Sequence, residues 1–214
     1  MKLVNLDVFK VNSFTPEYIE IGNAKNRIVI VQDYFMYPDL VRDYALSCGY
    51  FKMPHTKNPG AVSRLASDLP DVRDTIEFIK KDIYQDFQKR NDLQVMTFQA
   101  YRTNDNQAPH YDFFQYAGVC SLNTSDENPK ISGTSFHRYK DGHEYASTSM
   151  YRSEKVKENV HEDWETYHIE IHEYNKFIFY EGYLYHNLSW DERSWTTEIP
   201  RLTFNVFSAE DVYY

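Results

Sequence analysis

Cysteine is scarce in this chain. Only two of its 214 residues are cysteines, Cys48 and Cys120, and they lie far apart inside apolar runs. Two such residues do not form the disulfide framework of a small secreted protein, so a reducing compartment is the simpler expectation. The sequence also lacks an apolar run long enough to span a membrane and a signal-peptide cleavage site near Met1. We therefore expect a cytoplasmic protein that does not enter a membrane.

Positive charge is in short supply as well. The 23 Lys and Arg residues are outnumbered by 32 Asp and Glu residues, and the formal net charge is -9. Binding to nucleic-acid phosphates needs a surplus of basic side chains, so a nucleic-acid partner is disfavoured. Glycine and proline are few and scattered, at 7 and 8 copies, and nothing marks a linker. We expect one domain over residues 1–214, and no feature of the sequence indicates its oligomeric state.

Aromatic residues, by contrast, are plentiful. They make up 17% of the chain, with 19 Tyr and 14 Phe, and they favour sheet. Helical spacing of apolar residues predicts helices over Pro38–Cys48 and Asp71–Lys89, the second packed on the outside of a sheet. We predict a mainly β fold with helical support in 38–90 and an antiparallel barrel or sandwich core in 94–208. The predicted strands are Arg27–Gln32, Gln94–Tyr101, Ala117–Asn123, Ser132–Tyr139, Tyr167–Glu173, Lys176–Glu181, Leu184–Leu188 and Arg201–Ser208.

The last predicted strand has two different faces. Side chains alternate across a strand, so Arg201, Thr203 and Asn205 share one face, and the apolar residues between them share the other. A polar row of this kind fits an exposed outer face. It fits equally well a barrel whose polar interior holds a ligand, and the sequence leaves both interpretations open.

A candidate metal site begins at His110-Tyr111-Asp112. In extended backbone the imidazole and the carboxylate project from the same face, where they can bind one metal ion, although this pattern alone is weak. His186 lies in a strand, turn and strand context that would hold an inward side chain rigidly. Two histidines and one carboxylate form the facial triad that suits non-haem ferrous iron and leaves three coordination positions open. His110, Asp112 and His186 are therefore the candidate ligands and catalytic centre.

Arg201 and Thr203 follow the last of these ligands. The planar guanidinium of an arginine pairs with a carboxylate through two hydrogen bonds, and a threonine on the same strand face can add a hydroxyl donor. Beside a ferrous triad, such an arginine can hold the far carboxylate of a dicarboxylate cosubstrate while the near end chelates the metal. The sequence thus offers both ends of a binding site for that cosubstrate.

These segments together resemble the 2-oxoglutarate and iron(II)-dependent oxygenases. The likeness covers roughly residues 27 to 208. Within this superfamily, the sequence most resembles a branch found in phage and bacterial genomes, which is related in pattern to the prolyl hydroxylases. Val29 to Ala45 resembles the usual lead-in of strand and helix. The specific motifs are Pro109-His110-Tyr111-Asp112, Ala117–Asn123, Ser132–Tyr139, Phe177–His186 and Pro200-Arg201-Leu202-Thr203.

The resemblance implies a double-stranded β-helix, a jelly-roll or cupin-like barrel with the metal at its open end. It implies Fe(II), 2-oxoglutarate as cosubstrate and dioxygen, and a dioxygenase that hydroxylates an unidentified small molecule or peptide side chain. By position, His110, Asp112 and His186 match the metal ligands. Arg201 matches the anchor for the distal carboxylate, Thr203 its hydroxyl partner, and Tyr101 a further contact to the cosubstrate.

Two features depart from the family pattern. The interval between His186 and Arg201 is longer than usual, which predicts a bulging loop through Trp190–Thr197, and the first half of the chain carries no family signature. The polar segment Lys140–Arg152 is a candidate lid on composition alone.

Other interpretations of the same residues stand beside the oxygenase. One is a non-catalytic cupin-like module that binds metal or a partner, since fold alone does not fix function. Another is a cupin-like zinc or manganese enzyme, in which Arg201 would have no evident task. His161, His168 and His172 lie among acidic residues and could form a second metal site, although a solvated acidic surface is favoured. For His137 and His143 an ordinary hydrogen-bonded histidine is favoured over a substrate contact.

Overall fold

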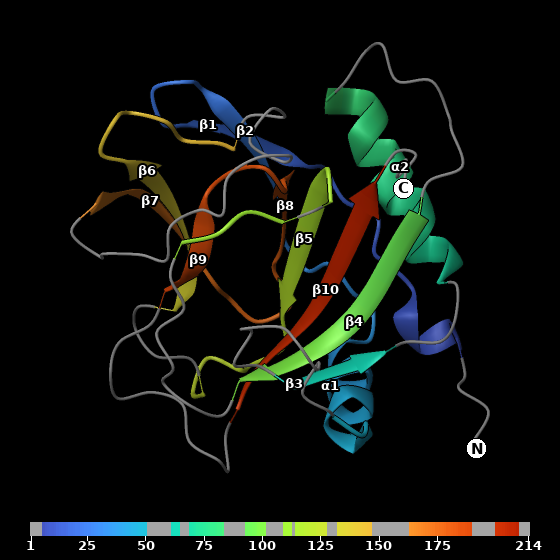
Figure 1. Cartoon of the computed structure of the whole chain (residues 1–214). Coiled ribbons are helices and arrows are strands. Elements are labelled where there is room, and N and C mark those ends of the chain that lie inside the picture. The colour runs from blue at the N-terminus through green and yellow to red at the C-terminus, as the bar shows by residue number, and fades with distance from the viewer. Residues whose placement is uncertain are drawn as a thin grey trace.

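The computed structural model describes residues 6–50, 61–64, 69–83, 93–101, 109–112, 114–127, 132–146, 163–189 and 200–209. In these residues two antiparallel sheets are accompanied by helices (Figure 1). The helical elements are η1 (Leu6–Phe9, a 3-10 helix), α1 (Pro38–Ser47) and α2 (Pro70–Ile83). The strands are β1 (Glu17–Ile21), β2 (Asn26–Val31), β3 (Ala61–Arg64), β4 (Leu93–Tyr101), β5 (Tyr116–Ser121), β6 (Gly133–Tyr139), β7 (Trp164–Ile171), β8 (Phe177–Glu181), β9 (His186–Ser189) and β10 (Arg201–Ala209).

The larger sheet has the strand order β1-β2-β8-β5-β10-β4-β3, and the smaller sheet has the order β7-β6-β9. All of these neighbours pair antiparallel. His110 forms an isolated antiparallel bridge with His186 at the edge of β9, so the segment around His110 extends the smaller sheet. This bridge places two distant parts of the chain side by side.

The path of the chain between the two sheets defines the fold. After β4 in the larger sheet, the chain crosses to the smaller sheet at His110 and returns as β5. It crosses again for β6 and β7, returns as β8, crosses as β9 and returns as β10. This winding is a double-stranded β-helix, so the predicted mainly β, jelly-roll class is confirmed.

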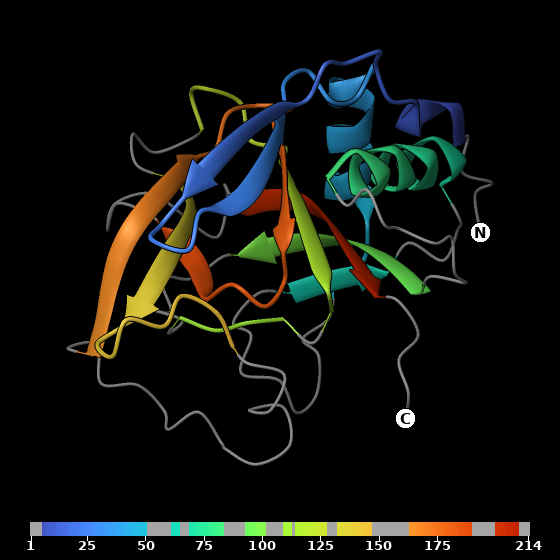
Figure 2. The ribbon, with the colours of Figure 1, turned by 90° about the horizontal axis from the view of Figure 1, so that it is seen from above.

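Both α-helices cover the outer face of the larger sheet, away from the smaller one (Figure 2). Apolar side chains of α2, such as Val72 and Ile76, share a core with Phe98 of β4 and Phe204 of β10. A second, smaller core lies between the sheets, where Phe136 of β6 meets Ile178 of β8. The predicted position of the second helix, outside a sheet, is therefore confirmed.

The two faces of β10 meet different surroundings. Leu202, Phe204 and Val206 point into the helix-covered core, whereas Arg201 and Asn205 line a cavity between the sheets. Thr203 is also buried. The polar row therefore faces a barrel interior, and the alternative of an exposed outer face is wrong.

Most predicted elements agree with the structure, and some boundaries do not. The first helix begins at Pro38, whose fixed φ suits a first turn, and it ends one residue earlier than predicted. The second helix ends at Ile83 in the described residues, and its predicted continuation to Lys89 lies outside them. The edge strands β1 and β3 were not predicted. No helix in the described part of the chain is long and apolar enough to cross a membrane.

Candidate metal centre

The three candidate ligands are brought together by backbone hydrogen bonds. His110 and His186 exchange two of them, with N to O distances of 3.0 and 2.8 Å, so their side chains start from directly opposed positions. The Asp112 amide donates to the Gly182 carbonyl at 2.7 Å, which ties the next inward residue to the turn before β9. Alternation along the segment then places the carboxylate of Asp112 on the same side as the His110 ring.

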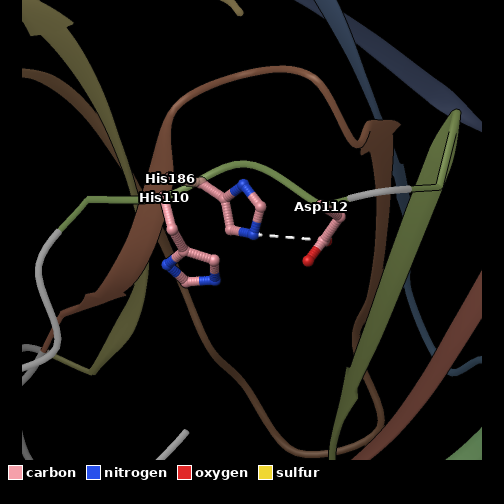
Figure 3. Close-up of side chains that lie close together, drawn as sticks. All are labelled: His110, Asp112 and His186. Carbon is pink, nitrogen blue, oxygen red and sulfur yellow. Dashed lines mark ion pairs between the residues drawn. The ribbon is translucent and has the colours of Figure 1, made fainter. Parts of the chain in front are cut away.

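The side chains of the triad converge on one space (Figure 3). One possible ligand atom from each of the three residues lies within 4.8 Å of the others, a spacing that a single metal ion can bridge. His186 Nε2 is 3.4 Å from an Asp112 carboxylate oxygen, and the centres of the two imidazole rings are 4.6 Å apart. His186 is buried and the other two are half-buried, so the cluster opens toward one side.

The orientation of His186 suits a ligand. Its Nδ1 lies 2.8 Å from the carbonyl oxygen of Leu184, so a hydrogen on Nδ1 donates to that oxygen. The lone pair of the neutral ring is then on Nε2, the nitrogen that faces Asp112. Metal-binding histidines are commonly fixed by such a donation from their second nitrogen.

Charge within the cluster couples two of its members. Burial alone would raise the pKa of the Asp112 carboxyl, but the His186 imidazole, by charge and hydrogen bonding, holds that pKa below its usual value. Burial likewise would lower the pKa of His186, and Asp112 instead raises it. A cation in this position is therefore favoured by the site, whether it is a proton or a metal ion.

The donor set fits a ferrous ion. Two imidazoles and one carboxylate, all on one side of a common centre, are the ligands of the facial triad, and the opposite positions stay open for exchangeable ligands. Fully structural zinc sites instead use four protein ligands in a closed tetrahedron. Among the described residues no fourth His, Cys, Asp or Glu joins this cluster.

A cavity of about 90 Å³ adjoins the cluster. All three candidate ligands line it, as do Tyr101 and Arg201. The structure thus brings five of the six residues singled out from the sequence to one space. Thr203, the sixth, is fully buried next to it but does not line it, and its hydroxyl has no hydrogen-bond partner among the described residues.

Arg201 is a buried cation with few partners. Its side chain is 5% exposed, its Nε atom has no hydrogen-bond partner in the described part of the chain, and no carboxylate there forms an ion pair with it. The guanidinium lies 5.5 Å from the centre of the Tyr101 ring, whose face attracts cations. Burial lowers the pKa of Arg201 to about 10, which leaves the group protonated at neutral pH. A buried charge without a counter-charge is costly, so this position is suited to an anionic ligand.

Thr134, which lines the cavity, and His172, which contacts Arg201, were not among the residues predicted for this site. Thr134 of β6 lines the cavity, and its hydroxyl is 3.0 Å from Nε2 of His172. His172 is buried and also contacts Arg201, so its interpretation as part of a solvated acidic surface is wrong. The alternation of the strand predicted over Tyr167–Glu173 could have shown this, because Glu170 and His172 are two residues apart and both are buried. The crowd of neighbouring acidic residues concealed that signal.

His137 and His143 are ordinary hydrogen-bonded or solvent-exposed histidines, as predicted. His137 is buried between the hydroxyls of Ser135 and Thr166, and His143 is exposed beside Asp141. His161 lies outside the described residues, as does the predicted loop Trp190–Thr197. Of the candidate lid, only 140–146 is described, and its far part is not.

Comparisons with known proteins give similarity to solved structures alone. No family model matches the chain, and no curated protein matches it in sequence. A Pseudomonas putida prolyl-4-hydroxylase is similar with a TM-score of 0.49 and 12% identity, over 88% of this chain and 95% of that one. The Fe(II)/α-ketoglutarate-dependent dioxygenase TqaL has a TM-score of 0.42 and 12% identity, over 82% and 75%. At this level of similarity the function has to be inferred from the geometry of the site.

Proposed function

We propose that this chain is a 2-oxoglutarate- and Fe(II)-dependent dioxygenase that hydroxylates a small molecule or a peptide side chain. One observation carries the proposal: the same cavity is lined by a His-Asp-His cluster and by the buried guanidinium of Arg201, which forms no ion pair with a carboxylate of the described residues. The cluster suits a metal ion and the guanidinium suits a carboxylate. A 2-oxo dicarboxylic acid is the kind of molecule that satisfies both.

In this proposal, His110, Asp112 and His186 hold the metal, and Leu184 fixes the ring of His186 through its carbonyl. Arg201 binds the carboxylate of the cosubstrate that lies away from the metal, and the Tyr101 ring helps to hold the guanidinium in place. The cavity has room for a small organic acid, whereas pockets for larger ligands measure several hundred Å³. The substrate therefore reacts at the open side of the cavity.

The bound metal and cosubstrate supply the oxidising chemistry. Overall, 2-oxoglutarate, dioxygen and a substrate C–H give succinate, carbon dioxide and C–OH, with one oxygen atom in succinate and the other in the product. The two electrons from the keto acid and the two from the substrate together reduce dioxygen. The protein's part is to fix the ligands, orient the cosubstrate and exclude water from the cavity.

The test is release of succinate from 2-oxoglutarate by purified protein with Fe(II), together with metal binding measured by calorimetry. We expect turnover in the wild type and its loss, with weakened metal binding, in His110→Ala. His143→Ala is the matched control, because it removes an exposed imidazole outside the cavity. Metal binding without succinate release in the presence of varied substrates would point instead to the non-catalytic module.

A further inference from the structure

Three buried side chains, Arg201 among them, form a chain of contacts between two parts of the cavity wall. The Arg201 Nη2 atom is 3.3 Å from Nδ1 of His172, and Nε2 of His172 is 3.0 Å from the hydroxyl oxygen of Thr134. Their exposed fractions are 5%, 6% and 4%. They come from β10, from the residue after β7 and from β6, so three separate segments meet in one chain of contacts.

The positions of the hydrogens in this chain follow from its chemistry. A guanidinium only donates, so Nδ1 of His172 must accept from Arg201. Burial, together with the charges of Arg201 and Lys176, holds the pKa of His172 well below its usual value, so the ring is neutral. A neutral ring that accepts at Nδ1 carries its hydrogen on Nε2. His172 therefore donates to the Thr134 oxygen.

This direction leaves the hydroxyl hydrogen of Thr134 for another acceptor. Within the described residues, Thr134 makes no other side-chain hydrogen bond. Its side chain lines the same cavity as Arg201. The hydroxyl can therefore donate into the cavity, beside a guanidinium whose Nε atom also lacks a partner in that part of the chain.

The local fold holds this arrangement in place. The backbone amide of His172 donates to the Ser132 carbonyl at 2.8 Å, which fixes the residue beside the start of β6. At Gly133 an added Cβ would lie 2.3 Å from the Glu170 carbonyl oxygen, so only glycine allows the two strands to approach this closely. Thr134 and His172 are thus held within hydrogen-bond distance by the main chain.

We propose that Thr134 is a ligand-binding residue whose hydroxyl donates to the same carboxylate that Arg201 binds, and that His172 is a positioning residue that orients both donors. This inference rests on the proposed function and adds a determinant of cosubstrate class. A dicarboxylic 2-oxo acid gains the contacts of Arg201 and Thr134, whereas a monocarboxylic 2-oxo acid has no group to place there. Thr134 therefore contributes to the preference for the dicarboxylic acid.

The experiment compares two probes by calorimetry on the Mn(II)-loaded full chain: 2-oxoglutarate and 2-oxobutyrate, which lacks the second carboxylate. We expect Thr134→Val to lower the affinity for 2-oxoglutarate on the order of tenfold to a hundredfold, which is the range for the loss of a hydrogen bond to a charged group. Binding of 2-oxobutyrate should change less than about twofold, because the lost contact is absent from that complex. Thr134→Ser, which keeps the hydroxyl, should restore most of the affinity. Should the valine variant fail to fold, Thr134→Ala removes the same hydroxyl.

Matched variants separate this role from general effects of substitution. Thr97→Val makes the same change at another buried threonine of the barrel that does not line the cavity, and it should leave both affinities unchanged. His172→Leu should lower the affinity for 2-oxoglutarate more than the affinity for 2-oxobutyrate. His172→Asn keeps an acceptor near the Nδ1 position, so its affinity for 2-oxoglutarate should fall less. A purely structural role of His172 would instead lower both affinities together.

Each outcome decides between the two proposals. If 2-oxoglutarate does not bind to the wild type, the proposed function and this inference both fail. If Arg201→Leu loses selective binding of 2-oxoglutarate but Thr134→Val keeps it, this inference fails and the proposed function stands. Equal losses of both probes in Thr134→Val also overturn the inference.

Discussion

On β10, the side chains that face the helices and those that face the smaller sheet differ in how completely the protein satisfies them. Phe204, on the helix side, is fully buried against the rings of Phe35 and Phe98. On the other side, Arg201, Thr203 and Asn205 each bury a polar atom that has no hydrogen-bond partner among the described residues. Buried polar atoms are normally paired, so such a group of exceptions calls for an explanation.

The difference indicates what each face is for. The helix side is completed by the chain's own apolar side chains and contributes stability. The inner side leaves polar atoms without a partner among the described residues, and in the proposed function a ligand supplies that partner. The two faces can therefore be tested separately, because substitutions on one should change unfolding and substitutions on the other should change ligand binding.

The largest effect on stability is expected at the helix-facing position Phe204. Phe204→Ala leaves a cavity in a close-packed core and should lower the free energy of unfolding by roughly 3 to 5 kcal/mol. Urea denaturation of the metal-free protein measures this loss. At a temperature where the variant is still folded, its affinity for Mn(II) should stay close to that of the wild type. A Phe204→Ala protein of normal stability would contradict the assignment of this face to the core.

The opposite result is expected on the inner face. Arg201→Met removes a buried charge that has no counter-charge in the described residues, so the free energy of unfolding should fall by no more than about 1 kcal/mol, or rise. Affinity for 2-oxoglutarate should fall by roughly a hundredfold, because a charge-assisted bidentate contact is lost. Thermal unfolding with and without 2-oxoglutarate and Mn(II) shows both effects: the added acid should stabilise the wild type and leave the variant unchanged. Severe destabilisation of Arg201→Met would show that the guanidinium is structural.

The same contrast explains what could be predicted from the sequence. The apolar alternation of β10 and the stripe of α2 depend on neighbouring residues alone, so both elements and their buried faces could be predicted. His110, Asp112 and His186 could be singled out because their residue types and order fit one kind of site. Their convergence, however, depends on the bridge between His110 and His186, which no local pattern encodes.

Thr134 and His172 show where prediction from the sequence ended. Threonine in a strand is common, and a histidine among acidic residues is typical of a solvated surface. Their importance comes from the pairing of β6 with β7 and from the approach of β10, which are contacts between distant segments. Thr203 illustrates the reverse, since the motif singles it out and the fold places it beside the cavity rather than on its wall.

Gly182 offers a test of the inner site that leaves the helix-covered core intact. An added Cβ would lie 2.2 Å from the Phe114 carbonyl oxygen and 3.2 Å from the Cβ of Asp112, so Gly182→Ala must shift the segment that carries the carboxylate. We expect affinity for Mn(II) to fall by roughly tenfold, the lower end for disturbed support of a ligand. Calorimetry measures it, and Gly49→Ala, where an added Cβ meets no atom within 4 Å, is a control for adding a methyl group. Unchanged affinity in Gly182→Ala would mean that Asp112 does not need this backbone position.

A last effect should come from His172, the buried neighbour of Arg201, whose charge state can affect stability. Because burial holds the pKa of His172 below its usual value of 6.5, the folded protein keeps the ring neutral. Above pH 6.5 the ring is neutral in both states, and it has no influence on the pH dependence of unfolding. As the pH falls below 6.5, the unfolded chain takes up a proton that the folded protein does not, and stability is lost at up to roughly 1.4 kcal/mol per pH unit. In urea titrations of the metal-free protein between pH 7.5 and 5, His172→Asn should therefore lose stability less steeply than the wild type, and parallel curves would show that this imidazole is not kept neutral by the fold.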